Sequence, residues 1–450
     1  MKKSLLFLFM VTFGVSAQTN WSSKATGFPN VSTGVPQISF ANGSTSVVWV
    51  YGYDGSGANP PANYKLWSKS ANGGDTWTTG SINLGSNFAN TAIGSIEAMT
   101  AAQAYVAAYP TAAGTFGGIW RTANNGLTWA KHTTALFNTG TDSFTNFVTF
   151  FNTTDGVCQG DPAGGYFEIY TTTNGDVTQP TWTRVPSANI PAPLAGEYGY
   201  VHNFTKVGNT IWFGTNKGRI FKSTNKGLNW TASQTPLTDL GGAADSGSYA
   251  FKDQNNGLLI SGNWEFWRTT DGGATWVAES PIGVYRNGNL CHVPGTTNTY
   301  ISSGADLEDN VRGVSYSIDG GLNWISFDNI NTAGGLAFAS ATVGLAGGFT
   351  ASSTSGGVWK YIGTQLATVN FDSAKAISAS PNPTTGILEL SGMNISQVAV
   401  YDILGKQISD ESYSALNTVT LNLSSLNTGV YMVKVTNDLG KTSTIKVIKE

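Results

Sequence analysis

The sequence of 450 residues contains few charged side chains and few histidines. Charged residues make up 11% of the chain, against about 25% in an average soluble protein. The net charge of −3 argues against a nucleic-acid partner, because a phosphate-binding surface needs clustered Lys and Arg. The three histidines, His132, His202 and His292, have no metal-ligand spacing, so we predict no metal and no other cofactor.

Cysteine is also scarce, with Cys158 and Cys291 as the two examples. The repeat described below assigns them to units that are not neighbours, and a disulfide needs Cα atoms within about 7 Å of each other. Two buried free thiols are therefore favoured over a disulfide.

The chain has one notable apolar run, at its N-terminus. Lys2 and Lys3 precede apolar residues from 5 to 13, and small residues follow at 15–17. This order predicts a secretory signal peptide over residues 1–17 that is removed before Gln18. The run is shorter than the roughly 20 residues of a membrane span, and no later stretch qualifies, so we predict no transmembrane segment.

Glycine, by contrast, is abundant, with 55 residues, and aromatic residues make up 12% of the chain. Together with the low charge, this composition is typical of short strands joined by tight turns in β-rich repeat proteins. Six stretches, called box segments below, share a Ser or Thr followed by Asn or Asp, a glycine and a tryptophan. They are residues 70–77, 122–129, 172–182, 223–230, 269–276 and 317–324. Their tryptophans recur about every 50 residues, close to the length of one four-stranded propeller blade.

Each box segment predicts a hairpin turn with a structural role. We expect the Asn or Asp side chain to bond a backbone N–H two residues on, and glycine to supply a positive φ. The tryptophan is expected to bury its ring between neighbouring sheets. The positions concerned are Asn72 and Trp77, Asn124 and Trp129, Asn174 and Trp182, Asn225 and Trp230, Asp271 and Trp276, and Asp319 and Trp324.

A short β-rich strand precedes each box, and such strands number seven. They are residues 47–52, 104–107, 156–160, 210–214, 257–262, 299–304 and 344–348, which we interpret as the inner strands of the blades. The seventh strand has no box, whereas Trp21 begins a strand that resembles one following a missing box. This favours an all-β, seven-bladed β-propeller over residues 18–364, closed by pairing of the N-terminal strand with the last blade. A six-bladed ring is the alternative.

The box segments resemble the Asp-box (BNR) repeats of sialidases, xyloglucanases and photosystem assembly-factor propellers. The resemblance covers roughly residues 18–365 and implies a propeller fold. In those families the boxes lie on the face away from the ligand, so the resemblance implies a structural role for them and does not define a reaction.

A different pattern follows a short linker at residues 365–375. Residues 376–450 contain Pro381-Asn382-Pro383-Thr384-Thr385-Gly386, then Val400-Tyr401-Asp402-Ile403-Leu404-Gly405-Lys406, then Leu426-Asn427-Thr428-Gly429-Val430-Tyr431-Met432-Val433-Lys434. Alternating strands punctuated by such turns predict a small β-sandwich. The segment resembles the C-terminal sorting domain of the type IX secretion system of Bacteroidota. This resemblance implies export through the type IX machinery, removal of the tail, and release or anchoring at the cell surface.

Ligand sites of propellers lie at the mouth of the central channel, on the loops away from the boxes. The acids predicted there are Asp54, Asp161, Glu197, Asp306 and Glu308, which are the candidate catalytic residues. The candidate binding residues on the same loops are Tyr198, Trp264, Glu265, Tyr285, Arg286 and Arg312. Aromatic rings beside carboxylates favour non-catalytic binding of a glycan or a protein. The alternative is a glycoside hydrolase or another polysaccharide-acting enzyme that uses paired carboxylates.

Overall fold

The computed structural model describes residues 20–59, 61–87, 89–139, 143–237, 246–304, 312–363, 366, 378–437 and 442–450. The chain divides into two compact units, Met1–Thr368 and Val369–Glu450, and each is described by itself. The predicted signal peptide and most of the predicted linker lie outside the described residues.

The described residues are all-β, as predicted. Besides strands they contain two 3₁₀ turns, η1 (Gly85–Asn87) and η2 (Ser187–Asn189). Within the described part of the chain, no helix has the length and hydrophobicity needed to cross a membrane.

Antiparallel four-stranded meanders build the first unit. The second to fifth, in chain order, are separate sheets. They comprise β7 (Thr91–Ala98), β8 (Ala104–Pro110), β9 (Gly118–Thr122) and β10 (Ala130–Lys131); β11 (Thr145–Phe150), β12 (Gly156–Pro162), β13 (Phe167–Thr172) and β14 (Thr183–Arg184); β15 (Gly199–Val207), β16 (Thr210–Thr215), β17 (Arg219–Ser223) and β18 (Thr231–Gln234); and β19 (Ser248–Phe251), β20 (Gly257–Ile260), β21 (Phe266–Thr269) and β22 (Val277–Glu279). The sixth comprises β24 (Asn289–His292), β25 (Tyr300–Gly304), β26 (Gly313–Ser317) and β27 (Asn323–Asp328), with β23 (Ile282–Gly283) added in parallel to β27.

The first and last meanders share one nine-stranded sheet. They comprise β3 (Ile38–Phe40), β4 (Val48–Asp54), β5 (Leu66–Ser70) and β6 (Thr78–Ser81), and β28 (Leu336–Ser340), β29 (Val343–Ser352), β30 (Ser355–Tyr361) and β1 (Trp21–Ala25). The short strand β2 (Thr33–Gly34) pairs with both β4 and β29. Trp21 pairs with Tyr361, so the N-terminal strand completes the last meander and the predicted closure is confirmed.

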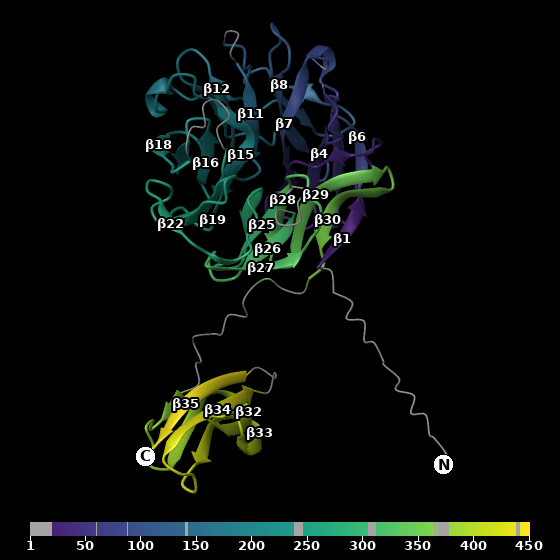
Figure 1. The fold of residues 1–450 in the computed structure, drawn as a ribbon. Coiled ribbons are helices and arrows are strands. Elements are labelled where there is room, and N and C mark those ends of the chain that lie inside the picture. Colours follow the sequence, from purple (N-terminus) through teal and green to yellow (C-terminus); the bar gives the residue numbers. More distant parts are fainter. Residues whose placement is uncertain are drawn as a thin grey trace, which may run out of the picture. The chain divides into compact units, whose positions relative to one another are not determined.

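The first strands of the meanders form a closed circle. Each contacts the next in the order β3, β7, β11, β15, β19, β24, β28 and back to β3. Figure 1 shows the meanders following one another around this ring, with β1 beside β30. The seven described inner strands support a seven-bladed ring, but the described strands of the first unit form six hydrogen-bonded sheets, so the blade count stays a prediction.

The strands that the sequence analysis interpreted as inner strands are in fact the second strands of the meanders. They correspond to β4, β8, β12, β16, β20, β25 and β29. Second strands are buried by a neighbour on each side and therefore have the most continuous apolar runs. The innermost strands line the channel and carry polar residues, which made them harder to recognise.

The box segments join the third strand of a meander to the fourth, and this defines two faces. We call the side that carries the boxes the box face. Because neighbouring strands are antiparallel, each first strand ends and each second strand begins at the box face. The opposite side, called the far face, carries the loops after the second strands and the loops that enter the first strands.

Inside the boxes the hydrogen bonding differs in one detail from the expectation. Oδ1 of Asn72 accepts the backbone N–H of Thr76 at 3.0 Å, four residues on rather than two. The hydroxyl of Ser70 supports the turn by accepting the N–H of Gly74 at 2.9 Å. Four other boxes repeat the Asn or Asp contact four residues on, whereas the insertion in the third box moves the donor to Thr181, seven residues on.

Glycine is required at the second left-handed position of the box. Gly126 has φ +83°, and a Cβ there would lie 2.3 Å from the ring of Trp67 in the preceding meander. Gly227 is in the same position against Val157 of its preceding meander, at 2.7 Å. The box therefore packs its backbone directly onto the neighbouring blade, which no other residue permits.

Apolar side chains from neighbouring meanders fill the spaces between them. One cluster combines Phe147 and Phe167 of the third meander with Phe213 and Phe221 of the fourth. The two cysteines are free thiols on separate meanders, Cys158 on β12 and Cys291 on β24. Burial raises the pKa of Cys291 to about 12.

The second unit is a five-stranded β domain. The sequence predicted a small β-sandwich here, and the β class is confirmed. It comprises β31 (Ser378–Ser380), β32 (Ile387–Asp402), β33 (Gln407–Asn422), β34 (Gly429–Asn437) and β35 (Thr442–Lys449). All five belong to one sheet, in which β33 and β34 flank the long strand β32. A bridge between Thr384 and Lys449 brings distant parts of the unit together around an aliphatic core that includes Leu388, Val400 and Val433.

Candidate functional site

The inner strands surround a cavity of about 860 Å³. Tyrosines contribute much of its lining, on strands of the first, second, fourth and fifth meanders. They are Tyr51, Tyr53, Tyr109, Tyr200 and Tyr249. Glu97, His202 and Lys206 add titratable groups to the same wall. This cavity is the candidate ligand site.

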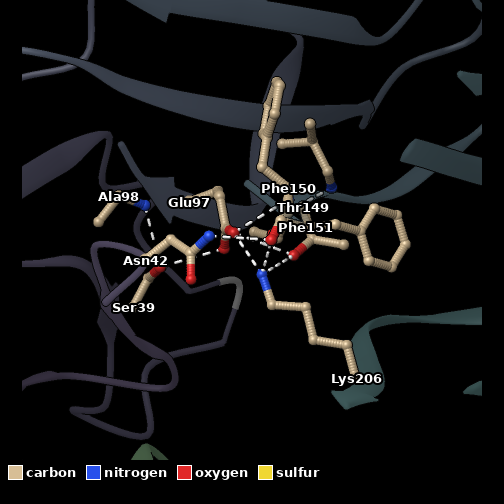
Figure 2. Close-up of polar contacts among 10 residues, drawn as sticks. Ser39, Asn42, Glu97, Ala98, Thr149, Phe150, Phe151 and Lys206 are labelled. Atoms are coloured by element: carbon tan, nitrogen blue, oxygen red, sulfur yellow. Dashed lines mark hydrogen bonds and ion pairs between the residues drawn. The ribbon is translucent and has the colours of Figure 1, made fainter. Parts of the chain in front are cut away.

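At the box end of the cavity, an ion pair and the hydrogen bonds around it connect four successive inner strands. Lys206 on β15 lies 2.7 Å from Glu97 on β7, measured from Nζ to Oε1 (Figure 2). The side chain of Glu97 also accepts hydrogen bonds from Ser39 on β3 at 3.1 Å and from Thr149 on β11 at 3.0 Å.

The rest of this network satisfies both charged groups. Oε1 of Glu97 accepts the N–H of Phe150 at 3.0 Å, and Lys206 donates to the hydroxyl of Thr149 at 2.8 Å and to the carbonyl of Phe150. Glu97 is 6% exposed, so it needs these partners. At this end the polar groups are therefore used to hold the inner strands together.

Midway along the channel, a histidine and a tyrosine contact the same backbone carbonyl, that of Gly94. The Tyr51 hydroxyl donates to this carbonyl at 3.3 Å. Nδ1 of His202 lies 3.1 Å from the carbonyl oxygen of Gly94 and 3.2 Å from the hydroxyl of Tyr51. Burial lowers the pKa of His202 and raises that of Tyr51, so both side chains are neutral near pH 7. The middle of the channel thus presents uncharged hydrogen-bonding groups.

The far-face end has a different surface. Every aromatic side chain of the described first unit that is more than about a third exposed lies on a far-face loop or strand end. These residues are Tyr53, Phe116, Tyr198 and Trp264. Exposed aromatic rings concentrated on one face are a common feature of binding surfaces.

Two of the candidate acids line a second far-face cavity of about 460 Å³, together with Tyr198. Oδ1 of Asp161 accepts hydrogen bonds from Nδ2 of Asn146 at 2.7 Å and from the backbone N–H of Gly199 at 2.9 Å. Desolvation outweighs these bonds and raises the pKa of Asp161 to about 6.

Glu197 lines the same cavity, but both of its carboxylate oxygens are already bonded within the protein. Its Oε2 lies 3.0 Å from the guanidinium of Arg219 and accepts the N–H of Leu194 at 2.7 Å. Its Oε1 accepts the hydroxyl of Thr215 at 2.7 Å. This carboxylate therefore stabilises the loop before β15.

The remaining candidate acids separate into two groups. Asp54 caps its own loop by accepting the N–H groups of Ser56 at 3.0 Å and Ala62 at 2.7 Å. A side-chain hydrogen bond from Ser56, followed by these two backbone bonds, lowers the pKa of Asp54. Asp306 and Glu308 lie outside the described residues.

The candidate binding residues lie on neighbouring far-face loops. Trp264 and Glu265 follow β20, whereas Tyr285 and Arg286 precede β24 and Arg312 precedes β26. The Tyr285 hydroxyl donates to the carbonyl of Trp264, so the structure brings these two loops together. Arg286 is 3% exposed and donates to the hydroxyl of Ser326 at 3.0 Å, which gives it a packing role.

Sequence reasoning missed Glu97, Lys206 and His202. Each is a titratable residue within a strand and belongs to no recognisable motif. A charged residue inside an otherwise apolar strand, such as Glu97 after Ile93 and Ile96, is the one signal that could have found the network.

The comparisons with known proteins agree with both units. Residues 378–450 match the family described as the secretion system C-terminal sorting domain. The solved structure "YCF48 bound to D1 peptide" has a TM-score of 0.50 and 13% identity, covering 77% of this chain and 98% of that chain. The GH74 xyloglucanase from Xanthomonas campestris has a TM-score of 0.48 and 12% identity, covering 95% of this chain and 74% of that chain.

At 13% identity the first of these structures shows the fold alone, and the comparison with curated proteins finds no match. The sorting domain predicted from the tail motifs is confirmed, and it indicates export to the cell surface or secretion. The chain therefore combines a β-propeller with a C-terminal type IX sorting domain.

Proposed function

We propose that the propeller binds a glycan or protein ligand at the far-face mouth of its channel, without catalysis. The observation that carries this proposal is the distribution of exposed aromatic rings: Tyr53, Phe116, Tyr198 and Trp264 all lie on the far face. The box end has its polar groups bonded to one another. A ligand that enters from the far face would meet a tyrosine-lined cavity of about 860 Å³.

The state of the candidate acids supports binding over paired-acid hydrolysis. A glycosidase needs two carboxyl groups that are about 5–9.5 Å apart and free to react. Glu197 is neutralised by Arg219, and Asp54 caps its loop. Asp161 has the raised pKa of a general acid but lacks a free described partner in its cavity.

The proposal includes a protein ligand as well as a glycan, because one protein of similar fold is described as bound to a peptide. We further propose that the six box segments are Asp-boxes with a structural role. Their internally satisfied side chains, such as Asn72 and Asp271, support that interpretation.

Immobilised full-length protein tests the binding proposal against a panel of plant and host glycans and a library of peptides. We expect retention of at least one ligand without release of reducing ends. Tyr53→Ala combined with Tyr198→Ala should weaken retention about tenfold or more, because truncated aromatic contacts commonly cost 1.4 kcal/mol or more. The matched control, Leu127→Ala combined with Leu228→Ala on the box face, should bind like the unmodified protein. Reducing-end release that is lost in Asp161→Asn would contradict the proposal and support the hydrolase.

We also propose that residues 1–17 direct the chain to the periplasm and that the C-terminal domain then directs it across the outer membrane. A chain that ends at residue 371 lacks the whole sorting domain. In a Bacteroidota host it should accumulate in the periplasm, as measured by cell fractionation and immunoblotting. Undiminished surface delivery of this truncated chain would contradict the proposed route.

A further inference from the structure

Trp264 differs from the other tryptophans of the chain. All 14 tryptophans lie within the described residues, and Trp264, at 37%, is the one whose side chain is exposed. The others are buried or half-buried, as is usual for such a large apolar side chain. An outward-facing tryptophan therefore calls for a functional explanation.

The backbone at Trp264 is held in an unfavourable conformation. Its φ of +65° lies in the left-handed region, where a bulky side chain is strained. The turn around it is fixed by three hydrogen bonds: Ser261 N–H to Glu265 O at 3.0 Å, Trp264 N–H to Ser261 O at 3.1 Å, and Glu265 N–H to Ser261 Oγ at 3.1 Å. Glycine would fit this turn better, so the ring is kept despite its cost to folding.

A second loop supports the ring from the next meander. The hydroxyl of Tyr285 donates to the carbonyl of Trp264, and Nδ2 of Asn287 donates to the carbonyl of Gly262 at 2.8 Å. The two aromatic rings lie 5.8 Å apart at an interplanar angle of 55°. Tyr285 also packs edge-on against the buried Phe266 at 5.3 Å. The pair is thus preorganised on two joined loops.

Glu265 provides a polar group beside the rings. Its side chain is exposed, and Oε2 accepts the hydroxyl of Ser261 at 3.1 Å. Oε1 has no hydrogen-bond partner among the described residues, so it is available to accept a hydrogen bond from a ligand.

We propose that Trp264, Tyr285 and Glu265 form a subsite for one pyranose ring of an uncharged oligosaccharide. A pyranose offers an apolar C–H face to an aromatic ring and hydroxyl donors to a carboxylate, which matches the two kinds of group present. A peptide fits less well, because the backbone groups of residues 261, 264 and 265 already bond within the two loops. This inference rests on the proposed binding function and names its ligand class.

The test uses the full-length protein with cellohexaose, mannohexaose and chitohexaose as probes. Trp264→Gly removes the ring and relieves the left-handed strain, so the melting temperature should stay the same or rise. The same change should weaken binding of the best saccharide about tenfold, measured by isothermal titration calorimetry. The control is Leu322→Ala, an exposed apolar residue in the box segment of the sixth meander, on the opposite face, and it should change affinity less than twofold.

Tryptophan fluorescence gives an independent measurement. Bound saccharide should reduce the fraction of emission that acrylamide quenches in the unmodified protein but not in Trp264→Gly. Saccharide binding that is unaffected by Trp264→Gly would overturn the subsite and leave the proposed function standing. Peptide binding that depends on Trp264 would overturn the ligand class alone. If neither saccharide nor peptide bound, both the subsite and the proposed function would be wrong.

Discussion

The box face and the far face of the propeller differ in what their polar side chains bond to. On the box face, Asn72 and its counterparts bond their own turns, and Glu97 and Lys206 bond each other and two further inner strands. On the far face, Asp161 has a raised pKa and Trp264 is exposed on a strained turn. In our proposal the same scaffold keeps the box face for stability and uses the far face for ligand binding.

The largest predicted effect comes from breaking the box-end network. Glu97→Ala leaves the Lys206 ammonium and the hydroxyls of Ser39 and Thr149 without their shared acceptor. We expect the free energy of unfolding to fall by about 3–5 kcal/mol, as when one partner of a buried ion pair is removed. Urea unfolding followed by tryptophan fluorescence measures the change.

A surface ion pair on the same face serves as the control. Asp75 pairs with Lys24 at 3.1 Å and with Lys360 at 2.6 Å, but its side chain is 47% exposed. Asp75→Ala should therefore cost about 1 kcal/mol or less. If the two substitutions had equal effects, the Glu97 network would not be what holds the inner strands together at the box end.

Alanine substitution of one glycine on each face compares how tightly the two faces are packed. Gly126→Ala strains a left-handed residue and places a Cβ 2.3 Å from the Trp67 ring, so it should destabilise by about 3 kcal/mol. Gly196→Ala on the far face has a similar φ of +67° but no atom within 4 Å of the added Cβ. It should cost about 1 kcal/mol. Thermal unfolding of both variants checks the difference, and a larger loss at Gly196 would contradict the packing role of the boxes.

Apart from the two control substitutions, the smallest predicted effect is a pH dependence on the far face. The pKa of Asp161 is raised to about 6, so between about pH 4 and 6 the folded state holds a proton that the unfolded state releases. The contribution of this group to stability therefore falls as the pH rises through 6. We expect the difference between pH 4.5 and pH 7 to be on the order of 1–2 kcal/mol. Asp161→Asn should remove that part of the pH dependence in urea unfolding; an unchanged profile would show that the carboxyl is solvated.

Much of the fold could be predicted from the sequence because it depends on local repeats. The box segments predicted the hairpins, and Trp21 predicted that the N-terminal strand completes the last meander. The hydrogen-bond partner four residues on could not be read from the pattern, because it depends on two successive left-handed residues such as Gly73 and Gly74.

The candidate site was less predictable because its contacts are long-range. Glu97 and Lys206 are more than 100 residues apart, and only the closed ring of inner strands brings them together. Trp264 was predicted at the mouth from its place in the repeat. Its exposure and its link to Tyr285 depend on the side-by-side position of two loops, which spacing does not reveal.

The central claim is that ligands bind at the far face and not at the box face. Hydrogen–deuterium exchange of the full-length protein, with and without the tightest-binding member of the panel, tests it most directly. We predict slower exchange on ligand binding in the far-face loops at residues 54–64, 192–199 and 261–265, and unchanged exchange in the box segments at 70–77, 122–129 and 223–230. Protection confined to the box segments would contradict the account.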